Sequence, residues 1–172
     1  AVSSEVRYTA PRYGKGDIVY SLFKSAFFQI NPEVAHDLTI NSLQILGHCL
    51  GALKPIQGRA CEFAGLRFAN PIGLAAGLDK DAQAVSGLSR LGFGHLEVGT
   101  VTPRAQSGNP KPRVFRLEKD TALINRLGFN NAGIDALVAR LSKQTYQGVI
   151  GVNIGKNKDT PNDAAYRDYV TC

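Results

Sequence analysis

The fold class is decided by the stretch Asn70-Pro-Ile-Gly-Leu-Ala-Ala-Gly-Leu-Asp-Lys80-Asp81, in which an apolar run ends in a glycine turn and charged residues. A short apolar run bounded by such a turn is typical of a buried strand. Apolar residues then recur at helical spacing through Ala84, Leu88 and Leu91 until Gly92. The segment therefore predicts a strand, a glycine-rich turn and a helix, in that order.

Two further apolar runs downstream also end in polar residues. The run from His95 to Val98 leads into Gly99-Thr100, and the run from Val149 to Ile154 leads into Gly155-Lys156-Asn157. Strands that alternate with helices favour a parallel α/β sheet. Since α/β barrels bind ligands at the carboxyl ends of their strands, we expect one rim to carry the polar residues Asp79, Lys80, Thr100, Asn153 and Lys156.

Two hairpins and one more helix are also predicted. Cys61-Glu62-Phe63 and Leu66-Arg67-Phe68 flank Ala64-Gly65 and suggest a small hairpin. A second hairpin is expected to pair Val114 to Leu117 with Ala122 to Asn125, and a helix is expected from Asp135 to Leu141. Together with the strands, these elements form a unit over residues 55–172.

The amino-terminal part is predicted to contain helices and no strands. Residues 1–17 are expected to be a disordered leader, and residues 18–54 are expected to form two short amphipathic helices joined at Asn31-Pro32, the second running until Gly47 and Gly51. Two interpretations of this helical pair stay open. It can be ordinary core packing, or it can be a helical hairpin that rests on a membrane surface.

Composition limits the function. The chain has 172 residues, which is short for an α/β barrel of about 250. Its net charge is +6, but the basic segment from Arg104 to Arg126 lacks interleaved aromatics, so an anion-binding loop or a solvated surface fits better than a nucleic-acid groove. No metal-ligand spacing is present, and the three cysteines form no CxxC motif and favour a reducing compartment.

Several polar residues have two possible roles. Lys80 can bind an anionic ligand, or it can be a rim lysine paired with Asp79 or Asp81. The amides around Asn125 to Asn131 can read the imide edge of a pyrimidine-like ring, or they can form a polar turn. His36 on the second predicted helix is either a packing residue or a functional one.

The stretch from Asn70 to Asp81 resembles the first-strand motif of the dihydroorotate dehydrogenases. The resemblance continues in order through the segments that begin at Glu97 (Glu-Val-Gly-Thr-Val-Thr-Pro), Gly108 (Gly-Asn-Pro-Lys-Pro-Arg-Val-Phe-Arg-Leu), Asn125 (Asn-Arg-Leu-Gly-Phe-Asn-Asn) and Gly151 (Gly-Val-Asn-Ile-Gly-Lys-Asn). The helical pair with Asn31-Pro-Glu-Val-Ala-His36 is similar to the class that passes electrons to a membrane quinone. The resemblance implies a (β/α)8 barrel, present here as its first part.

The resemblance also implies roles for particular residues. FMN would be bound by Ala76, Gly77, Leu78, Asp79, Lys80, Thr100 and Asn153. Dihydroorotate would be held by Lys80 and by the loop Asn125, Arg126, Leu127, Gly128 and Phe129. His36 and Arg116 would line the quinone entrance. No metal is implied.

The implied reaction is the oxidation of (S)-dihydroorotate to orotate in the synthesis of UMP, with FMN as cofactor and a membrane quinone as acceptor. The implied location is the cytoplasmic face of a bacterial inner membrane. The catalytic serine of the family lies in a motif that follows these segments, and residues 1–172 do not contain it. We therefore expect this chain alone to be inactive. Alternatives are a non-catalytic half-barrel and another FMN barrel enzyme, such as a tRNA dihydrouridine synthase.

Overall fold

The computed structural model describes residues 23–172. The predicted leader, residues 1–17, and the start of the first predicted helix lie outside the described residues. Residues 23–28 are helical, and helix α2 (Pro32–Leu50) follows them. The Asn31 side chain accepts a hydrogen bond from the Glu33 amide at 2.9 Å, and Gly51 ends the helix at φ 68°. The predicted start of this helix and its predicted end at Gly51 are confirmed, whereas Gly47 lies inside the helix.

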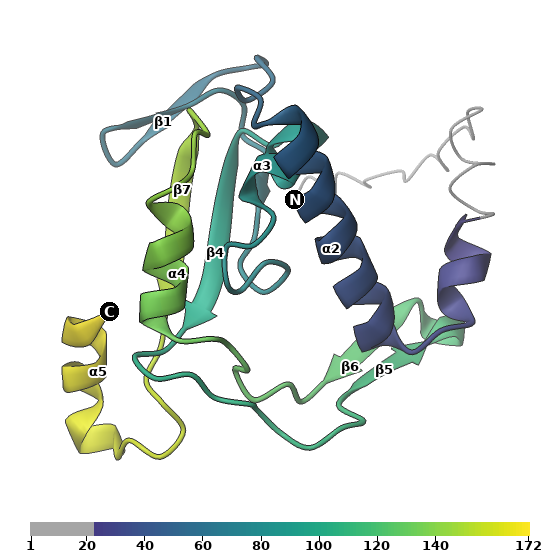
Figure 1. The fold of residues 1–172 in the computed structure, drawn as a ribbon, viewed down its shortest axis with the longest axis vertical. Coiled ribbons are helices and arrows are strands. Elements are labelled where there is room, and N and C mark those ends of the chain that lie inside the picture. Colours follow the sequence, from purple (N-terminus) through teal and green to yellow (C-terminus); the bar gives the residue numbers. More distant parts are fainter. Residues whose placement is uncertain (1–22) are drawn as a thin grey trace, which may run out of the picture.

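Three parallel strands form the centre of the molecule (Figure 1). Strand β4 (His95–Val101) lies between β3 (Gly73–Leu74) and β7 (Val149–Ile154). The predicted parallel sheet is therefore confirmed. The first predicted strand, from Pro71 to Ala76, is shorter than expected: beyond Leu74 the chain turns, and the Gly77 amide bonds to the Gly99 carbonyl at 2.8 Å. Strand β4 is longer than expected and reaches Val101.

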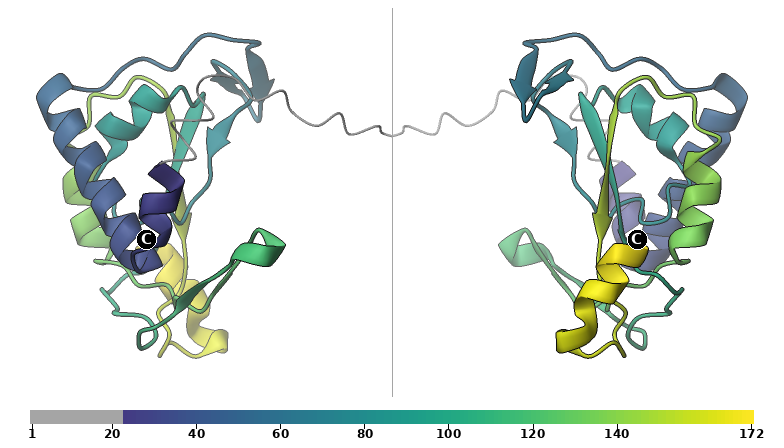
Figure 2. Two further views of the ribbon diagram at one scale, coloured as in Figure 1. Left: turned by 90° about the vertical axis from the view of Figure 1, so that its right-hand side faces the viewer. Right: turned by 90° about the vertical axis from the view of Figure 1, so that its left-hand side faces the viewer.

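Helices cover one side of the strands and hairpins project from the other (Figure 2). The covering elements are α2, α3 (Val85–Leu88) with the 3-10 turn η1 (Ser89–Leu91), and α4 (Ile134–Leu141). The buried side chains of β4 alternate toward these helices, which leaves intervening residues such as Thr100 facing the other way. The core between the two layers contains Val85, Leu88, Leu96, Val98, Val101 and Leu137.

The hairpins form as predicted. Strand β1 (Cys61–Phe63) pairs with β2 (Leu66–Phe68), and β5 (Val114–Leu117) pairs with β6 (Ala122–Asn125) through the turn η2 (Glu118–Asp120). The chain then continues beyond β7 into η3 (Asn162–Ala164) and α5 (Ala165–Thr171), which the sequence pattern did not predict.

Three general features concern the described part of the chain. Among residues 23–172, no helix combines the length and the apolar character that a membrane span requires. The three cysteines, Cys49, Cys61 and Cys172, are free thiols. No group of three or more His, Cys, Asp or Glu side chains within residues 23–172 is placed to hold a metal ion.

Candidate active site at the carboxyl ends of the strands

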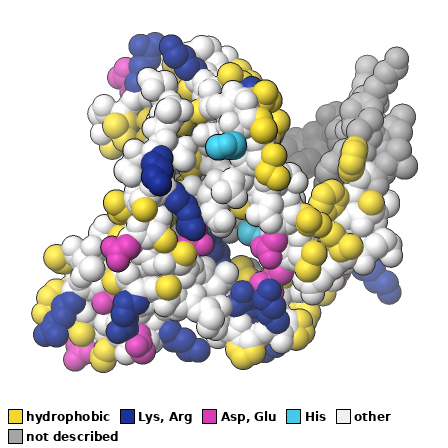
Figure 3. Space-filling model, in the orientation of Figure 1, with side chains coloured by type: hydrophobic (Ala, Val, Ile, Leu, Met, Phe, Trp, Pro, Cys, Tyr) yellow, Lys and Arg dark blue, Asp and Glu magenta, His cyan; other side chains and the backbone are white. Residues whose placement is uncertain are grey.

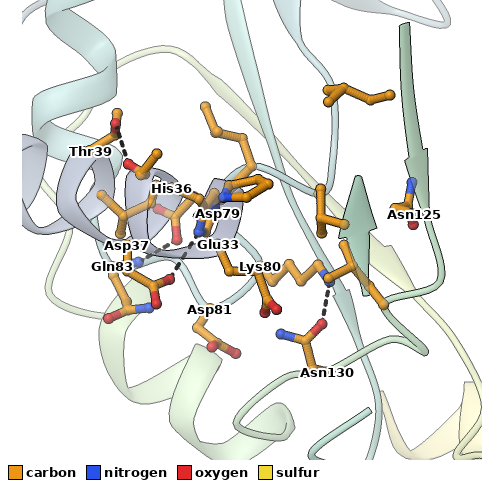
Figure 4. Close-up of a pocket in the computed structure, with 18 of the residues that line it drawn as sticks. Glu33, His36, Asp37, Thr39, Asp79, Lys80, Asp81, Gln83, Asn125 and Asn130 are labelled. Carbon is orange, nitrogen blue, oxygen red and sulfur yellow. Dashed lines mark hydrogen bonds and ion pairs between the residues drawn. The ribbon is translucent and has the colours of Figure 1, made fainter. Parts of the chain in front are cut away.

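A cavity of about 510 Å³ opens between α2 and the carboxyl ends of the strands (Figure 4). We call it the helix cavity. Its walls come from α2, from the turn after β3, from the β5–β6 hairpin and from the loop that follows it. The predicted site residues that line it are His36, Gly77, Leu78, Asp79, Lys80, Arg116, Asn125 and Leu127.

Lys80 reaches across the helix cavity. Its Nζ donates a hydrogen bond to Asn130 Oδ1 at 2.8 Å, and this pair faces the cavity in Figure 4. The neighbouring carboxylates are engaged elsewhere. Asp79 accepts from the Gln83 and Ala84 amides at 2.8 and 2.7 Å, and Asp81 accepts from the Ala132 amide at 2.8 Å. The alternative of a rim ion pair between Lys80 and either aspartate is therefore not the arrangement that the structure shows.

Burial shifts the pKa of both Lys80 and Asp79. Desolvation lowers the pKa of Lys80 below its ordinary value, and the nearby Arg113 cation lowers it further, while Asp81 and Glu33 oppose the shift. Desolvation raises the pKa of Asp79, although its bonds to the Ala84 and Gln83 amides oppose this. The Asp79 carboxylate thus faces the Gln83 and Ala84 amides, and the residue is 1% exposed.

His36 and Arg116 face the same cavity from opposite sides. His36 Nε2 donates to the Leu78 carbonyl at 2.6 Å and so joins α2 to the turn that carries Lys80. Arg116 Nη1 donates to the Ile30 carbonyl at 2.7 Å, and its guanidinium lies 4.7 Å from the centre of the Phe28 ring. The structure thus brings together the two residues predicted at the quinone entrance.

A second cavity of about 500 Å³, the strand-end cavity, lies at the ends of β4 and β7. Thr100 donates to Asn153 Oδ1 at 2.6 Å, and the Asn153 amide nitrogen donates to Glu97 at 3.4 Å. The side chains of Thr100 and Asn153 therefore form one polar surface. Gly128 and Phe129 also line this cavity, as do Gly155 and Lys156.

The predicted substrate loop runs between the two cavities. Asn125 and Leu127 line the helix cavity, whereas Gly128 and Phe129 line the strand-end cavity. Arg126 lines neither: its Nη2 donates to the Pro112 carbonyl at 3.0 Å, and its guanidinium lies 5.9 Å from the centre of the Phe115 ring. The structure thus places four of the five loop residues at a cavity and Arg126 outside both.

Comparisons with known proteins identify the family. A sequence profile described as dihydroorotate dehydrogenase matches residues 59–172. The chain belongs to the dihydroorotate dehydrogenase family. Among its relatives, the dihydroorotate dehydrogenase (quinone) of Aromatoleum aromaticum is 51% identical over 155 residues, which cover 90% of this chain and 44% of that protein. The dihydroorotate dehydrogenase (quinone) of Aeromonas hydrophila is 52% identical over 158 residues, which cover 90% of this chain and 47% of that protein.

Solved structures of the dihydroorotate dehydrogenase family have the same fold. The DHODH of Eimeria tenella in complex with ferulenol superposes with a TM-score of 0.66 at 45% identity, over 80% of this chain and 39% of that one. The ligand-free form gives a TM-score of 0.65 at the same identity. The predicted fold class, the first part of an α/β barrel with an amino-terminal helical extension, is confirmed. The chain spans about half the length of the curated relatives that it matches.

Two residues near the site were not among the individually predicted site residues. Asn130 holds Lys80, whereas the resemblance implied substrate contacts only as far as Phe129. Arg113 is buried and bonds to Glu33 of α2 at 3.0 Å. The signal for Asn130 was its place in the amide cluster, and the signal for Arg113 was its place in the basic segment. Neither signal identified the partner.

Proposed function

We propose that the protein containing this chain oxidises (S)-dihydroorotate to orotate, with FMN as cofactor and a membrane quinone as electron acceptor, in pyrimidine biosynthesis. The observation that carries this proposal is the Lys80 ammonium group, held by Asn130 in a cavity that Asn125 also lines. The family match and the quinone-linked names of the bacterial relatives support it. They favour it over the tRNA dihydrouridine synthase alternative.

The residues around the strand ends fit a flavin. Gly77 has φ 112°, and the position where its Cβ would stand is open, so a flat ligand can approach the backbone there. The Thr100 hydroxyl and the Asn153 amide offer both donors and acceptors to ring heteroatoms. We infer that FMN is held by Ala76, Gly77, Leu78, the Asp79 backbone, Lys80, Thr100 and Asn153. Bound FMN would supply the two-electron redox capacity.

The substrate is proposed to lie between Lys80 and the loop that begins at Asn125. The Lys80 ammonium would pair with the substrate carboxylate as a charge-assisted hydrogen bond. The Asn125 amide can both donate to and accept from the imide edge of the ring. Fixing the two ends of the substrate orients its C6 carbon, and such positioning is a large part of the catalytic effect in this kind of site. The base that removes the C5 proton is expected from the family's serine motif, which residues 1–172 lack.

The quinone is proposed to enter through the helix cavity beside His36 and Arg116. Apolar side chains on residues 23–28 and on α2 are exposed, and Figure 3 shows hydrophobic atoms over this region. They include Phe23, Val34, Leu38, Ile45 and Leu50. A helical pair with such a face can bind a membrane interface without crossing the bilayer. This supports a peripheral location, which we propose to be the cytoplasmic face of the inner membrane.

The test is an assay of the complete protein for flavin content and for quinone reduction that depends on dihydroorotate. Replacement of Lys80 by Met removes the charge but keeps the length, and we expect orotate affinity to fall about a hundredfold, the range of a lost hydrogen bond to a charged group. Lys143→Met changes an exposed lysine and serves as the control. A protein without flavin, or an unchanged orotate affinity in Lys80→Met, would contradict the proposal.

A further inference from the structure

Arg113 is a buried cation at the start of the β5–β6 hairpin. Only 6% of the residue is exposed. Its Nη1 donates to the carbonyl oxygens of Ser107 and Asn109, at 2.6 and 2.9 Å, and approaches the Leu127 carbonyl at 3.5 Å. The planar guanidinium presents five N–H donors in a fixed fork, whereas the lysine ammonium is a compact point charge with three donors. Arg113 therefore joins the 107–109 segment to the predicted substrate loop.

The same guanidinium reaches α2 on its other edge. Its Nε and Nη2 both lie 3.0 Å from Glu33 Oε1, and the two side chains are 7% and 14% exposed. Lys111 also approaches this carboxylate, at 3.6 Å, but its side chain is 63% exposed. In a nearly buried pair, loss of one partner leaves the other charge without compensation. Of these two cations, Arg113 is therefore the main partner of the Glu33 carboxylate in the first turn of α2.

The substrate loop is packed tightly on what Arg113 holds. The Asn109 amide donates to the Leu127 carbonyl at 3.0 Å, and the Asn109 side chain donates to the Arg126 carbonyl at 2.7 Å. A Cβ at Gly128 would stand 2.9 Å from the Asn109 backbone nitrogen, so the loop has no room to shift toward Asn109. A shift of Arg113 is therefore expected to displace the substrate loop, because Asn109 contacts both.

Helix α2 also holds the other side of the helix cavity, through the His36 bond to the Leu78 carbonyl. One helix thus contacts both the turn before Lys80 and, through the Glu33–Arg113 pair, the loop that begins at Asn125. We propose that Arg113 is a positioning residue: through its pair with Glu33, it makes the affinity for dihydroorotate depend on the position of α2. This inference rests on the proposed function. It gives α2, which carries His36 of the proposed quinone entrance, a part in substrate affinity.

The experiment uses the complete protein with its flavin, and it measures orotate affinity by flavin absorbance titration together with kcat and KM for dihydroorotate. Glu33→Gln removes the carboxylate charge but keeps the shape of the side chain. Arg113→Lys keeps the positive charge but removes the planar set of N–H donors of the guanidinium. In both variants we expect the orotate Kd and the KM to rise about tenfold, an ordinary coupling between sites, with kcat and flavin content retained. The double variant should lose little more than either single one.

Lys111→Gln is the matched control, since it removes a cation from the same carboxylate without touching the loop, and its orotate Kd should stay within about twofold of wild type. If Arg113→Lys does not fold, the orotate Kd of Glu33→Gln alone tests the inference. The inference would be overturned if the wild type is active and its Glu33→Gln variant binds orotate with unchanged affinity. It would also be overturned if Lys111→Gln lost as much orotate affinity as Glu33→Gln. A wild type that does not oxidise dihydroorotate would instead overturn the proposed function.

Discussion

Neighbouring asparagines of one loop have separate tasks. The Asn130 side chain faces the helix cavity and holds Lys80, whereas Asn131 is buried. Asn131 Oδ1 accepts from the Thr102 and Gly133 amides at 3.2 and 2.9 Å, and its Nδ2 donates to the Phe129 carbonyl at 2.8 Å. Asn131 thereby fixes the backbone that presents Phe129, and the loop can offer polar groups to a ligand without losing its shape.

The protonation of Lys80 gives a prediction at the scale of a single residue. Burial and the Arg113 cation lower the pKa of Lys80, while Glu33 raises it. An anionic ligand needs the protonated lysine, so orotate affinity should fall as pH rises through this lowered pKa. Arg113→Gln removes a positive charge and should move the fall to higher pH. Glu33→Gln removes a negative charge and should move it to lower pH. Titrations of orotate affinity between neutral and alkaline pH measure both shifts, and two shifts in the same direction would contradict the prediction.

The sequence identified single residues better than their partners. Lys80 could be predicted because a lysine directly after a glycine turn at a strand end is a local pattern. Its partner Asn130 lies 50 positions away, and Glu33 lies 80 positions from Arg113. Such contacts depend on how α2 and the β5–β6 hairpin pack, which no local spacing encodes. The choice between a rim ion pair and a ligand-facing Lys80 therefore stayed open until the tertiary structure was known.

Helix α2 and helix α3 approach each other backbone to backbone. A Cβ at Gly47 would stand 2.5 Å from the Gly87 nitrogen, and a Cβ at Gly87 would overlap the Leu43 carbonyl. Glycine at both positions is therefore a packing requirement of this contact. Because α2 also lines the helix cavity, the close approach fixes the width of the cavity as well as the helix position.

This contact gives a prediction at the scale of an element. Gly87→Ala should reduce the free energy of unfolding by about 1–3 kcal/mol, because the added methyl overlaps backbone that cannot move aside. Ser42→Ala, on the exposed face of α2, should change stability by less than about 0.5 kcal/mol. Urea denaturation of the complete protein, followed by circular dichroism, compares the two variants. Equal stability of Gly87→Ala and wild type would show that α2 can move away from α3.

Element prediction succeeded where periodicity and capping agreed. Strand β7, both hairpins and α2 have the expected limits, since each combines a regular apolar pattern with a recognisable turn or cap. The β3 prediction was too long because only Gly73 and Leu74 pair with β4 before the chain turns toward the rim. Helix α5 was missed because none of its seven residues is buried, so it carries no core-facing pattern.

At the scale of the whole molecule, the strands are covered on one side only. Within residues 23–172 the sheet order is β3-β4-β7, and β7 therefore has a free edge. Its Val152 and Ile154 are 40% and 38% exposed, and they alternate along the strand with the less exposed Gly151 and Asn153. An exposed edge with apolar residues invites further strand pairing. The chain covers 44% and 47% of the two bacterial relatives, so in a complete barrel these surfaces would be covered by the remaining strands.

This one-sided structure predicts how residues 1–172 behave when they are produced alone. In the proposed site, Gly77, Thr100 and Asn153 would contact the flavin ring, but barrels of this type usually build their phosphate site from loops after the seventh and eighth strands. The isolated chain should therefore retain less than about a tenth of the flavin per protein that the complete protein carries, and it should bind a fluorescent apolar dye at its open strand face. Flavin absorbance, with the protein's mass verified, measures the first quantity. Stoichiometric flavin on a chain of 18.5 kDa would mean that the first strands alone supply the binding energy, and the proposed division of the site between two halves of a barrel would be wrong.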